Sequence, residues 1–212
     1  MANPFQSERL IYRAVEEEDD AFFNVLNSDP VSYMNSAPFL PVPLGKAGAK
    51  GYREWLDSCI LGVVICLPAP APAAIAAATT TTTGLPATAL ATPDVSKPIP
   101  IGAISLSGTK PGLRHHRNTM IGLNIAGPYQ GQGYGSEAIK WALRWAFKRA
   151  GMHKVEIGAF SYNEGAVRLY DRLGFKEEGR KRQQLWHDGQ WHDIVESGML
   201  EDEWRELYGE QA

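Results

Sequence analysis

The sequence predicts an α/β (α+β) sandwich with a mixed central sheet flanked by helices. Segments with the period of a strand alternate with segments of helical period, and the chain closes with a two-stranded hairpin. Its 212 residues suit one domain with a sizeable core, and the 44% apolar and 21% charged fractions are those of an ordinary globular protein. We therefore expect a single domain over residues 1–212.

The first half of the chain contains four apolar strand segments and two helical ones. The acidic run 16–20 is placed where a helix dipole favours negative charge, so a helix should begin there and run to about Leu26. The segment 27–43, rich in Pro, Ser and aromatic residues, is expected to be a loop. The other expected elements are strands over 9–14, 61–66, 101–106 and 120–125, a helix over 51–59 and a turn over 110–118.

The second half has clearer periodicity. Apolar residues at helical spacing predict a helix from Ser136 to Ala150, which Gly151 ends, and alternation predicts a strand from Lys154 to Phe160. A further helix should start at Asn163 and stop at Gly174. Two final strands should meet at 188–189, because Asp-Gly is a strong signal for a two-residue hairpin turn. Trp186 and Trp191 would then pair across the hairpin.

An insertion of low complexity separates two of the expected strands. Ala, Thr and Pro supply 23 of the 31 residues in 68–98, and large apolar side chains are almost absent. Such a composition offers little to offset the entropy of ordering, so we expect a flexible Ala/Thr/Pro-rich insertion. The long uncharged stretch 60–78 is not expected to span a membrane, because Pro68, Pro70 and Pro72 would break a helix.

Charge and cysteine content narrow the class of protein. A net charge of −3 gives no general drive toward nucleic acid or an anionic membrane. Cys59 and Cys66 are too few for a disulfide framework, and their spacing matches no zinc signature. The first residues lack the pattern of a secretory signal, so we expect a cytoplasmic protein.

A glycine-rich loop between a strand and a helix carries the main functional signal. The glycines of Gln130-Gly131-Gln132-Gly133-Tyr134-Gly135-Ser136 let backbone N–H groups converge, and the following helix adds unpaired donors, so the loop suits a phosphate or pyrophosphate. The Lys of a Walker A loop is absent, and the spacing is Gly-x-Gly-x-Gly instead of the dinucleotide fingerprint Gly-x-Gly-x-x-Gly. A plain strand-to-helix turn is the structural alternative.

Two sequence blocks resemble the GNAT N-acetyltransferase superfamily. Gln130-x-x-Gly133-x-Gly135 is similar to its acyl-CoA pyrophosphate loop, Gln/Arg-x-x-Gly-x-Gly/Ala. The second block is Asn163-x-x-Ala166-x-x-x-Tyr170-x-x-x-Gly174-Phe175, which the family places beside the pantetheine arm. The resemblance covers residues 120–200 well and 7–59 more weakly. Within the superfamily the chain looks most like the branch that acetylates spermidine or ribosomal-protein N-termini.

This resemblance implies a cosubstrate, acetyl-CoA, and a set of residues that bind it. The cofactor-binding residues would be Leu123, Asn124 and Ile125 of the central strand, the whole loop from Gln130 to Ser136, and Asn163, Ala166 and Tyr170. In the family, strand backbone groups pair with the pantetheine and polarise the thioester carbonyl. Tyr170 would be the general acid that protonates the departing thiolate, and a core tyrosine is the alternative. Asn163 could also serve as the N-cap of its helix.

The sequence departs from the family pattern at one catalytic position. Met120 stands where related enzymes often carry a glutamate that accepts the amine proton. His115 and His116 are candidates for this role, although solvated loop histidines are the simpler interpretation, and we assign no base. His187 and His192 would not face each other across the hairpin and have no acidic partner, so no metal site is predicted.

The function expected from these features is transfer of an acetyl group to a primary amine by direct attack. The amine would belong to a small molecule or a peptide, with 27–43 as the substrate-side loop by family analogy. The acidic run 16–20 is either a polyamine-attracting surface or simply a helix start. A non-catalytic acyl-CoA-binding module, a different acyl donor and a nucleotide-binding protein stay open. Because relatives often form dimers, a homodimer is possible.

Overall fold

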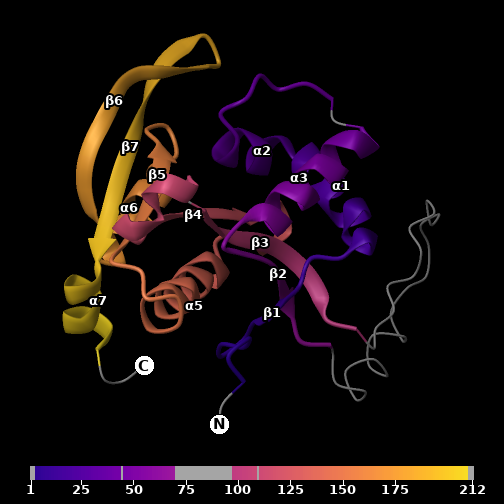
Figure 1. Cartoon of the computed structure of the whole chain (residues 1–212). Coiled ribbons are helices and arrows are strands. Elements are labelled where there is room, and N and C mark those ends of the chain that lie inside the picture. The colour runs from indigo at the N-terminus through magenta and orange to yellow at the C-terminus, as the bar shows by residue number, and fades with distance from the viewer. Residues whose placement is uncertain (1–2, 44, 70–96, 109, 210–212) are drawn as a thin grey trace.

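The computed structural model describes residues 3–43, 45–69, 97–108 and 110–209. Their strands form one seven-stranded sheet in the order β1-β2-β3-β4-β5-β7-β6 (Figure 1). Within this sheet β4 and β5 run parallel, whereas the other neighbouring strands are antiparallel. The predicted mixed sheet is therefore confirmed. The strands are β1 Ile11–Arg13, β2 Leu61–Leu67, β3 Ile99–Ser107, β4 Asn118–Ile125, β5 Lys154–Phe160, β6 Lys176–His187 and β7 Gln190–Leu200.

Helices cover both faces of the sheet, as Figure 1 shows for α5 on one side and α1 and α3 on the other. Alternation along β2 explains the two layers, because successive side chains of a strand point to opposite faces. Val63 and Ile65 join the core beneath α5, while Val64 and Cys66 join the core beneath α1 and α3. The helices are α1 Asp20–Ser28, α2 Pro30–Ser36, α3 Lys46–Ser58, α5 Tyr134–Lys148, α6 Glu164–Arg172 and α7 Glu201–Tyr208, with 3₁₀ turns η1 Glu17–Asp19, η2 Pro111–His116 and η3 Gly127–Tyr129.

The C-terminal half follows the predicted elements closely. β5 has the predicted bounds, and β6 and β7 form the predicted hairpin. Its turn places Asp188 at φ 47° and Gly189 at φ 77°, the left-handed conformations that a tight hairpin turn requires. Trp186 pairs with Trp191 across the hairpin, and their ring centroids lie 5.0 Å apart, as predicted.

The N-terminal half differs from the prediction at three helices. The expected loop 27–43 contains the helix α2, which starts with a capping Asp29 followed by Pro30, a local signal that the composition of the loop obscured. α3 begins at Lys46 and not at Gly51, because packing overrides the weak helix propensity of its glycines. The predicted helix at the acidic run begins with the 3₁₀ turn η1 before α1. α7 at the C-terminal end was not predicted; its buried Trp204 anchors it to the core.

The Ala/Thr/Pro-rich insertion lies between β2 and β3, as predicted, and most of it, residues 70–96, falls outside the described residues. Leu67 pairs with Ile99, so the chain leaves and re-enters the sheet at neighbouring positions. Among the described helices, none is both long and apolar enough to cross a membrane. One domain over 1–212 and a cytoplasmic location stay predictions.

Candidate functional site: a cleft where two parallel strands separate

Strands β4 and β5 separate partway along β4. They pair only from Asn118 to Ile121, although β4 continues along β3 to Ile125. The N–H of Ala126 donates to the Ile101 carbonyl of β3 with an N···O distance of 2.9 Å, and backbone groups alternate in direction along an antiparallel strand. The backbone groups of Leu123 and Ile125 therefore point away from β3, to the side that β5 has left. An open strand edge of this kind can pair with an extended ligand.

A cavity of about 610 Å³ occupies this separation. Its walls come from the end of β4, the glycine-rich loop, the start of α5, one face of α6 and the helix α2. Most of the predicted cofactor-binding residues line it, namely Leu123, Asn124, Ile125, Gln130, Gly131, Gly133, Gly135, Ser136, Asn163, Ala166 and Tyr170. The structure thus brings together both sequence blocks and the central strand. Gln132 and Tyr134 are not among the described residues that line this cavity.

The glycine-rich loop has the conformation expected of an anion-binding turn. Gly131 and Gly133 adopt φ values of 72° and 84°, in the left-handed region that L side chains avoid. α5 begins directly afterwards at Tyr134, and no described side chain caps this end of the helix. Its first N–H groups are therefore available beside the cavity, where the helix dipole adds partial positive charge.

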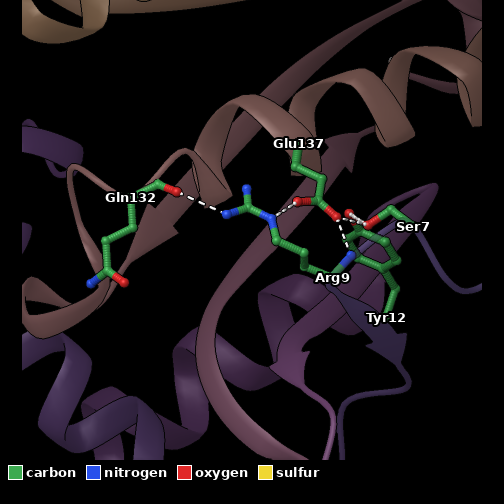
Figure 2. A network of polar contacts seen from close by, with 5 residues as sticks. All are labelled: Ser7, Arg9, Tyr12, Gln132 and Glu137. Atoms are coloured by element: carbon green, nitrogen blue, oxygen red, sulfur yellow. Dashed lines mark hydrogen bonds and ion pairs between the residues drawn. The ribbon is translucent and has the colours of Figure 1, made fainter.

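A polar network anchors the loop from outside the cavity (Figure 2). Arg9 donates from Nη1 to the Gln132 carbonyl at 3.1 Å and from Nε to Glu137 at 2.8 Å. The Arg9 backbone N–H and the Ser7 hydroxyl donate to the second Glu137 oxygen at 2.7 and 2.6 Å. The Arg9 guanidinium also lies 4.7 Å from the centre of the Tyr134 ring. Gln132 and Tyr134 thus contact Arg9, which braces the loop against the N-terminal segment.

This network was missed by the sequence reasoning. Arg9 and Glu137 lie 128 residues apart, so no local spacing connects them. Burial raises the pKa of Glu137, but the hydrogen bonds from Ser7 and Arg9 lower it by more than burial raises it. The pKa of Glu137 therefore lies below its ordinary value. Glu137 is therefore a carboxylate at neutral pH and holds Arg9 against the loop.

The helix α6 presents the second sequence block to the cavity. The Asn163 side chain accepts a hydrogen bond from the Ala166 N–H at 3.1 Å and so caps the helix. Tyr170 stands two turns later on the same face, and both residues line the cavity. Burial raises the pKa of Tyr170 to about 12, so the phenol is protonated near neutral pH. None of the described residues hydrogen-bonds this hydroxyl, which leaves it available to a ligand.

Helix α2 closes the cavity and is tied to the end of β4. Asp29 accepts hydrogen bonds from the Val31 N–H, the Ser32 hydroxyl and the Gly127 N–H, at 3.1, 2.9 and 3.1 Å. Gln130 donates to the Ser32 hydroxyl at 3.0 Å and to the Ile125 carbonyl at 2.7 Å. The Gln130 amide therefore acts within the protein, joining the loop, α2 and β4, and the Ile125 carbonyl is already occupied.

A second cavity of about 650 Å³ adjoins the first. It lies between the segment following α2, the helix α3 and the other side of β4. Ser36, Leu123 and Asn124 line both cavities, so the two meet at the open part of β4. Ligands bound in the two cavities would therefore meet beside Leu123. Residues of the segment 27–43 line this second cavity, and the substrate-side role expected for that segment stays a prediction.

The remaining candidates lie elsewhere. His115 and His116 are exposed in η2, and neither they nor Met120 are among the described residues that line the two cavities. His187 stacks on Tyr162 with ring centroids 4.1 Å apart, and His192 packs against the same ring edge-on. No group of three potential metal ligands occurs in the described part of the chain.

The separated strands, the glycine-rich loop and the two adjoining cavities define an α/β protein with an open strand edge and a cleft in the middle of its sheet. Comparison with known families identifies the group. The family described as "Acetyltransferase (GNAT) domain" matches residues 9–176, well over half of the chain, and the protein belongs to this family. The predicted recognition is confirmed.

Curated relatives share about half of their length with this chain. An uncharacterized N-acetyltransferase from the SPbeta prophage of Bacillus subtilis is 32% identical over 87 residues, 41% of this chain and 49% of the relative. The [ribosomal protein uS5]-alanine N-acetyltransferase of Escherichia coli is 30% identical over 104 residues, 49% of this chain and 53% of the relative.

Solved structures show the same fold. The spermidine N-acetyltransferase of Vibrio cholerae, solved in complex with CoA and spermine, aligns with a TM-score of 0.70 at 21% identity and covers 93% of this chain and 99% of its own. A GNAT-family acetyltransferase from Bacillus anthracis aligns with a TM-score of 0.67 at 18% identity, covering 93% and 98%.

Proposed function

We propose that the protein is an acetyl-CoA-dependent N-acetyltransferase that acts on a primary amine by direct attack. The observation that carries this proposal is the junction of the two cavities at Leu123, with the amide-rich loop at one side and the Tyr170 hydroxyl in the same cleft. Family membership supports it, as does the CoA complex of the V. cholerae relative.

In this proposal the backbone does most of the donor binding. The N–H groups of Gly131, Gly133 and the start of α5 hold the pyrophosphate, as a helix N-terminus with glycine-rich entry does in other proteins. The open edge of β4, at the Leu123 carbonyl and the Ile125 N–H, pairs with the pantetheine arm like an added strand, whereas the Ile125 carbonyl is occupied by Gln130. Asn163 keeps α6 in place as its cap, and the loop's contact with Arg9 holds the amides at a fixed orientation.

The chemistry is assigned to groups at the junction. The Leu123 N–H, directed to the open side, stabilises the negative charge that develops on the thioester oxygen when the amine attacks. The amine nitrogen bonds to the acetyl carbon, the carbon–sulfur bond breaks, and Tyr170 gives its proton to the departing thiolate. The proton that the nitrogen loses passes to water, and water returns a proton to the Tyr170 phenolate, so the enzyme is regenerated. A phenol with a pKa of about 12 is protonated at neutral pH and is therefore in the form that can donate a proton. Neither cysteine lines the described cavities, and direct attack needs no covalent enzyme intermediate.

One observation favours a second candidate, a non-catalytic acyl-CoA-binding module. No carboxylate is found among the described residues that line either cavity, so an obvious base for a protonated amine is missing. The intact Tyr170 in the cleft argues for catalysis.

The test is titration calorimetry of acetyl-CoA followed by an assay of thiol release with a panel of amines. Binding with turnover supports the enzyme, and binding without turnover supports the module. Absence of acetyl-CoA binding, or competition by ATP, contradicts both. The same assay with succinyl-CoA and propionyl-CoA tests whether acetyl is the preferred acyl group. The glycine-rich loop does not determine this preference, because in the proposal it binds the pyrophosphate and not the acyl group.

A further inference from the structure

The described residues that line the second cavity are uncharged and mostly apolar, and four of them are aromatic. Tyr33 and Phe39 line it from the chain around α2, and Tyr52 and Trp55 from α3, where their rings stack with centroids 5.6 Å apart. Phe39 is 72% exposed, and a large apolar side chain that is exposed beside a cavity is typical of a binding surface. The cavity is therefore shaped for an apolar occupant of small-molecule size.

The charges of α3 point elsewhere. Gly48, Gly51, Tyr52 and Trp55 follow helical spacing and form the face that lines the cavity. The charged residues of the same helix occupy its other faces, where Arg53 pairs with Asp20 at 2.7 Å and Lys50 with Glu54 at 3.7 Å. Among the described lining residues none is charged, and the polar ones are the phenols and the side chains Asn27, Ser36 and Asn124. Burial raises the pKa of Tyr52, which keeps its phenol neutral.

These walls disfavour a polycation. Each ammonium group of a polyamine that enters an apolar cavity loses hydration, and the loss is offset only where a carboxylate pairs with it. The same desolvation lowers the pKa of any amine that is bound here, which favours the neutral and nucleophilic form. An amine that is neutral before it binds avoids the cost altogether and requires no base at the position of Met120.

We propose that the acceptor is a small, weakly basic amine on an aromatic body, such as an arylamine, which enters through this second cavity and reaches the thioester at Leu123. This inference rests on the proposed acetyltransferase function and deepens it by naming the acceptor class. The products are the N-acetylated amine and free CoA thiol, because the proton lost by the amine balances the proton gained by sulfur.

Gly51 offers a selective way to fill the cavity. A Cβ added at Gly51 meets no atom within 4 Å, so a larger side chain can extend into the open space without displacing a neighbour. Gly51 lines the acceptor cavity and is not among the described residues of the donor cavity. Gly112 in η2 is the matched control, because its Cβ also meets nothing within 4 Å and it lines neither cavity.

The experiment measures kcat/KM for aniline derivatives, spermidine and short peptides with the wild type, Gly51→Leu and Gly112→Leu, together with the acetyl-CoA affinity of each. We expect arylamines to exceed spermidine by about tenfold or more, and Gly51→Leu to lower their kcat/KM about tenfold with acetyl-CoA affinity within about twofold. Gly112→Leu should match the wild type in both. With an arylamine the rate should be flat from about pH 6.5 to about pH 9, because no ammonium titrates in that range.

Preferred turnover of spermidine or of a peptide would overturn the acceptor assignment while leaving the acetyltransferase proposal intact. Unchanged arylamine kinetics in a folded Gly51→Leu variant would show that the cavity is not the acceptor site. Acetyl-CoA binding with no turnover of any amine would overturn both the acceptor assignment and catalysis. Loss of acetyl-CoA binding in the wild type would instead contradict the donor site.

Discussion

Replacing Gly133 with alanine tests whether the loop holds its amides as the structure shows. Gly133 adopts φ 84°, and the added Cβ would lie 3.3 Å from Nη2 of Arg9. A left-handed conformation costs an L residue about 1–2 kcal/mol, which exceeds the gain of roughly 0.4–1 kcal/mol from the less flexible unfolded chain. Arg9 cannot move aside freely, because Glu137 and the Gln132 carbonyl hold its guanidinium. The contact with Arg9 adds to the backbone strain and offsets that gain, so we expect Gly133→Ala to destabilise the fold by a net of about 1–2 kcal/mol.

For a domain of this size that loss corresponds to a fall in melting temperature of roughly 2–8 °C. If the loop relieves the strain by rotating its amides, acetyl-CoA affinity should fall by up to about thirtyfold. Two neighbouring glycines separate the causes. Gly131→Ala introduces the same strain at φ 72° with no atom near its Cβ, so it should also lower the melting temperature. Gly135→Ala has no positive φ and places its Cβ 3.4 Å from Leu123 Cδ2, so its stability should equal or exceed that of the wild type.

Differential scanning calorimetry of the three variants, followed by titration with acetyl-CoA, makes the comparison. Equal melting temperatures for Gly131→Ala, Gly133→Ala and the wild type would refute the reasoning, because the loop would then not require left-handed residues. A Gly133→Ala variant that escapes the loss of stability and still binds acetyl-CoA normally would remove the pyrophosphate assignment, because relief of the strain requires the loop amides to rotate.

Three further predictions concern the acid, the anchor and the wall of the cleft. Tyr170→Phe should lower turnover by about 10²–10⁴-fold with little change in acetyl-CoA affinity, and a rate equal to that of the wild type would remove Tyr170 from the mechanism. Because the pKa of Tyr170 is about 12, wild-type turnover should not decline through loss of the phenol proton below about pH 10. Glu137→Gln should cost about 1–3 kcal/mol of unfolding free energy at pH 7. The pKa of Glu137 is lower in the folded protein than in the unfolded chain, where it is about 4.3, so the Glu137 carboxylate stabilises the fold above that pH and loses this effect as the pH falls. The difference in unfolding free energy between the wild type and Glu137→Gln, measured by denaturant titration, should therefore shrink toward about pH 3. A difference that stays constant with pH would contradict this. Asp29→Ala should destabilise by about 1–2 kcal/mol through loss of the α2 cap, with Asp29→Asn retaining most of the stability; thermal unfolding that ranks them equally would count against the cap.

The parts of the site that the sequence predicted are those encoded by local spacing. The glycines of 130–136 predicted a tight loop in which backbone N–H groups converge, and Gly131 and Gly133 have the positive φ values that such a loop uses. Asn163 and Tyr170 are seven residues apart, so a regular helix places both on the face that lines the cleft. The β6–β7 hairpin is specified by its Asp-Gly turn in the same way. In each case a few adjacent residues determine the geometry.

The parts that the sequence did not predict depend on contacts between distant segments. The Arg9–Glu137 pair joins the first strand region to α5, and nothing at either position indicates the other. Within segment 27–43, composition indicated a loop, whereas the helix α2 forms because Asp29 caps it and the end of β4 provides a docking surface through Gly127. The glycines of α3 weakened the helical pattern, yet at Gly51 the missing side chain leaves space in the acceptor cavity.

The two cavities differ in how much of their lining the backbone supplies, and this explains why residue motifs predicted the first, whereas the second was indicated only by family analogy through segment 27–43. In the proposed function, donor binding at the loop and at Leu123 uses N–H and C=O groups that every residue carries. It therefore needs glycines and an open strand edge, and the glycines form a recognisable motif. The acceptor cavity is built from side chains such as Tyr52 and Trp55 that also have the character of ordinary core residues. The proposed role of Tyr52 and Trp55 can be inferred only from the structure, which places them on the same cavity as Leu123 of β4. A fold of this kind can therefore keep its glycine-rich loop while substitutions on α2 and α3 change which acceptor it binds. For that reason we infer the class of acceptor amine from the lining of the second cavity and not from the substrates of the relatives.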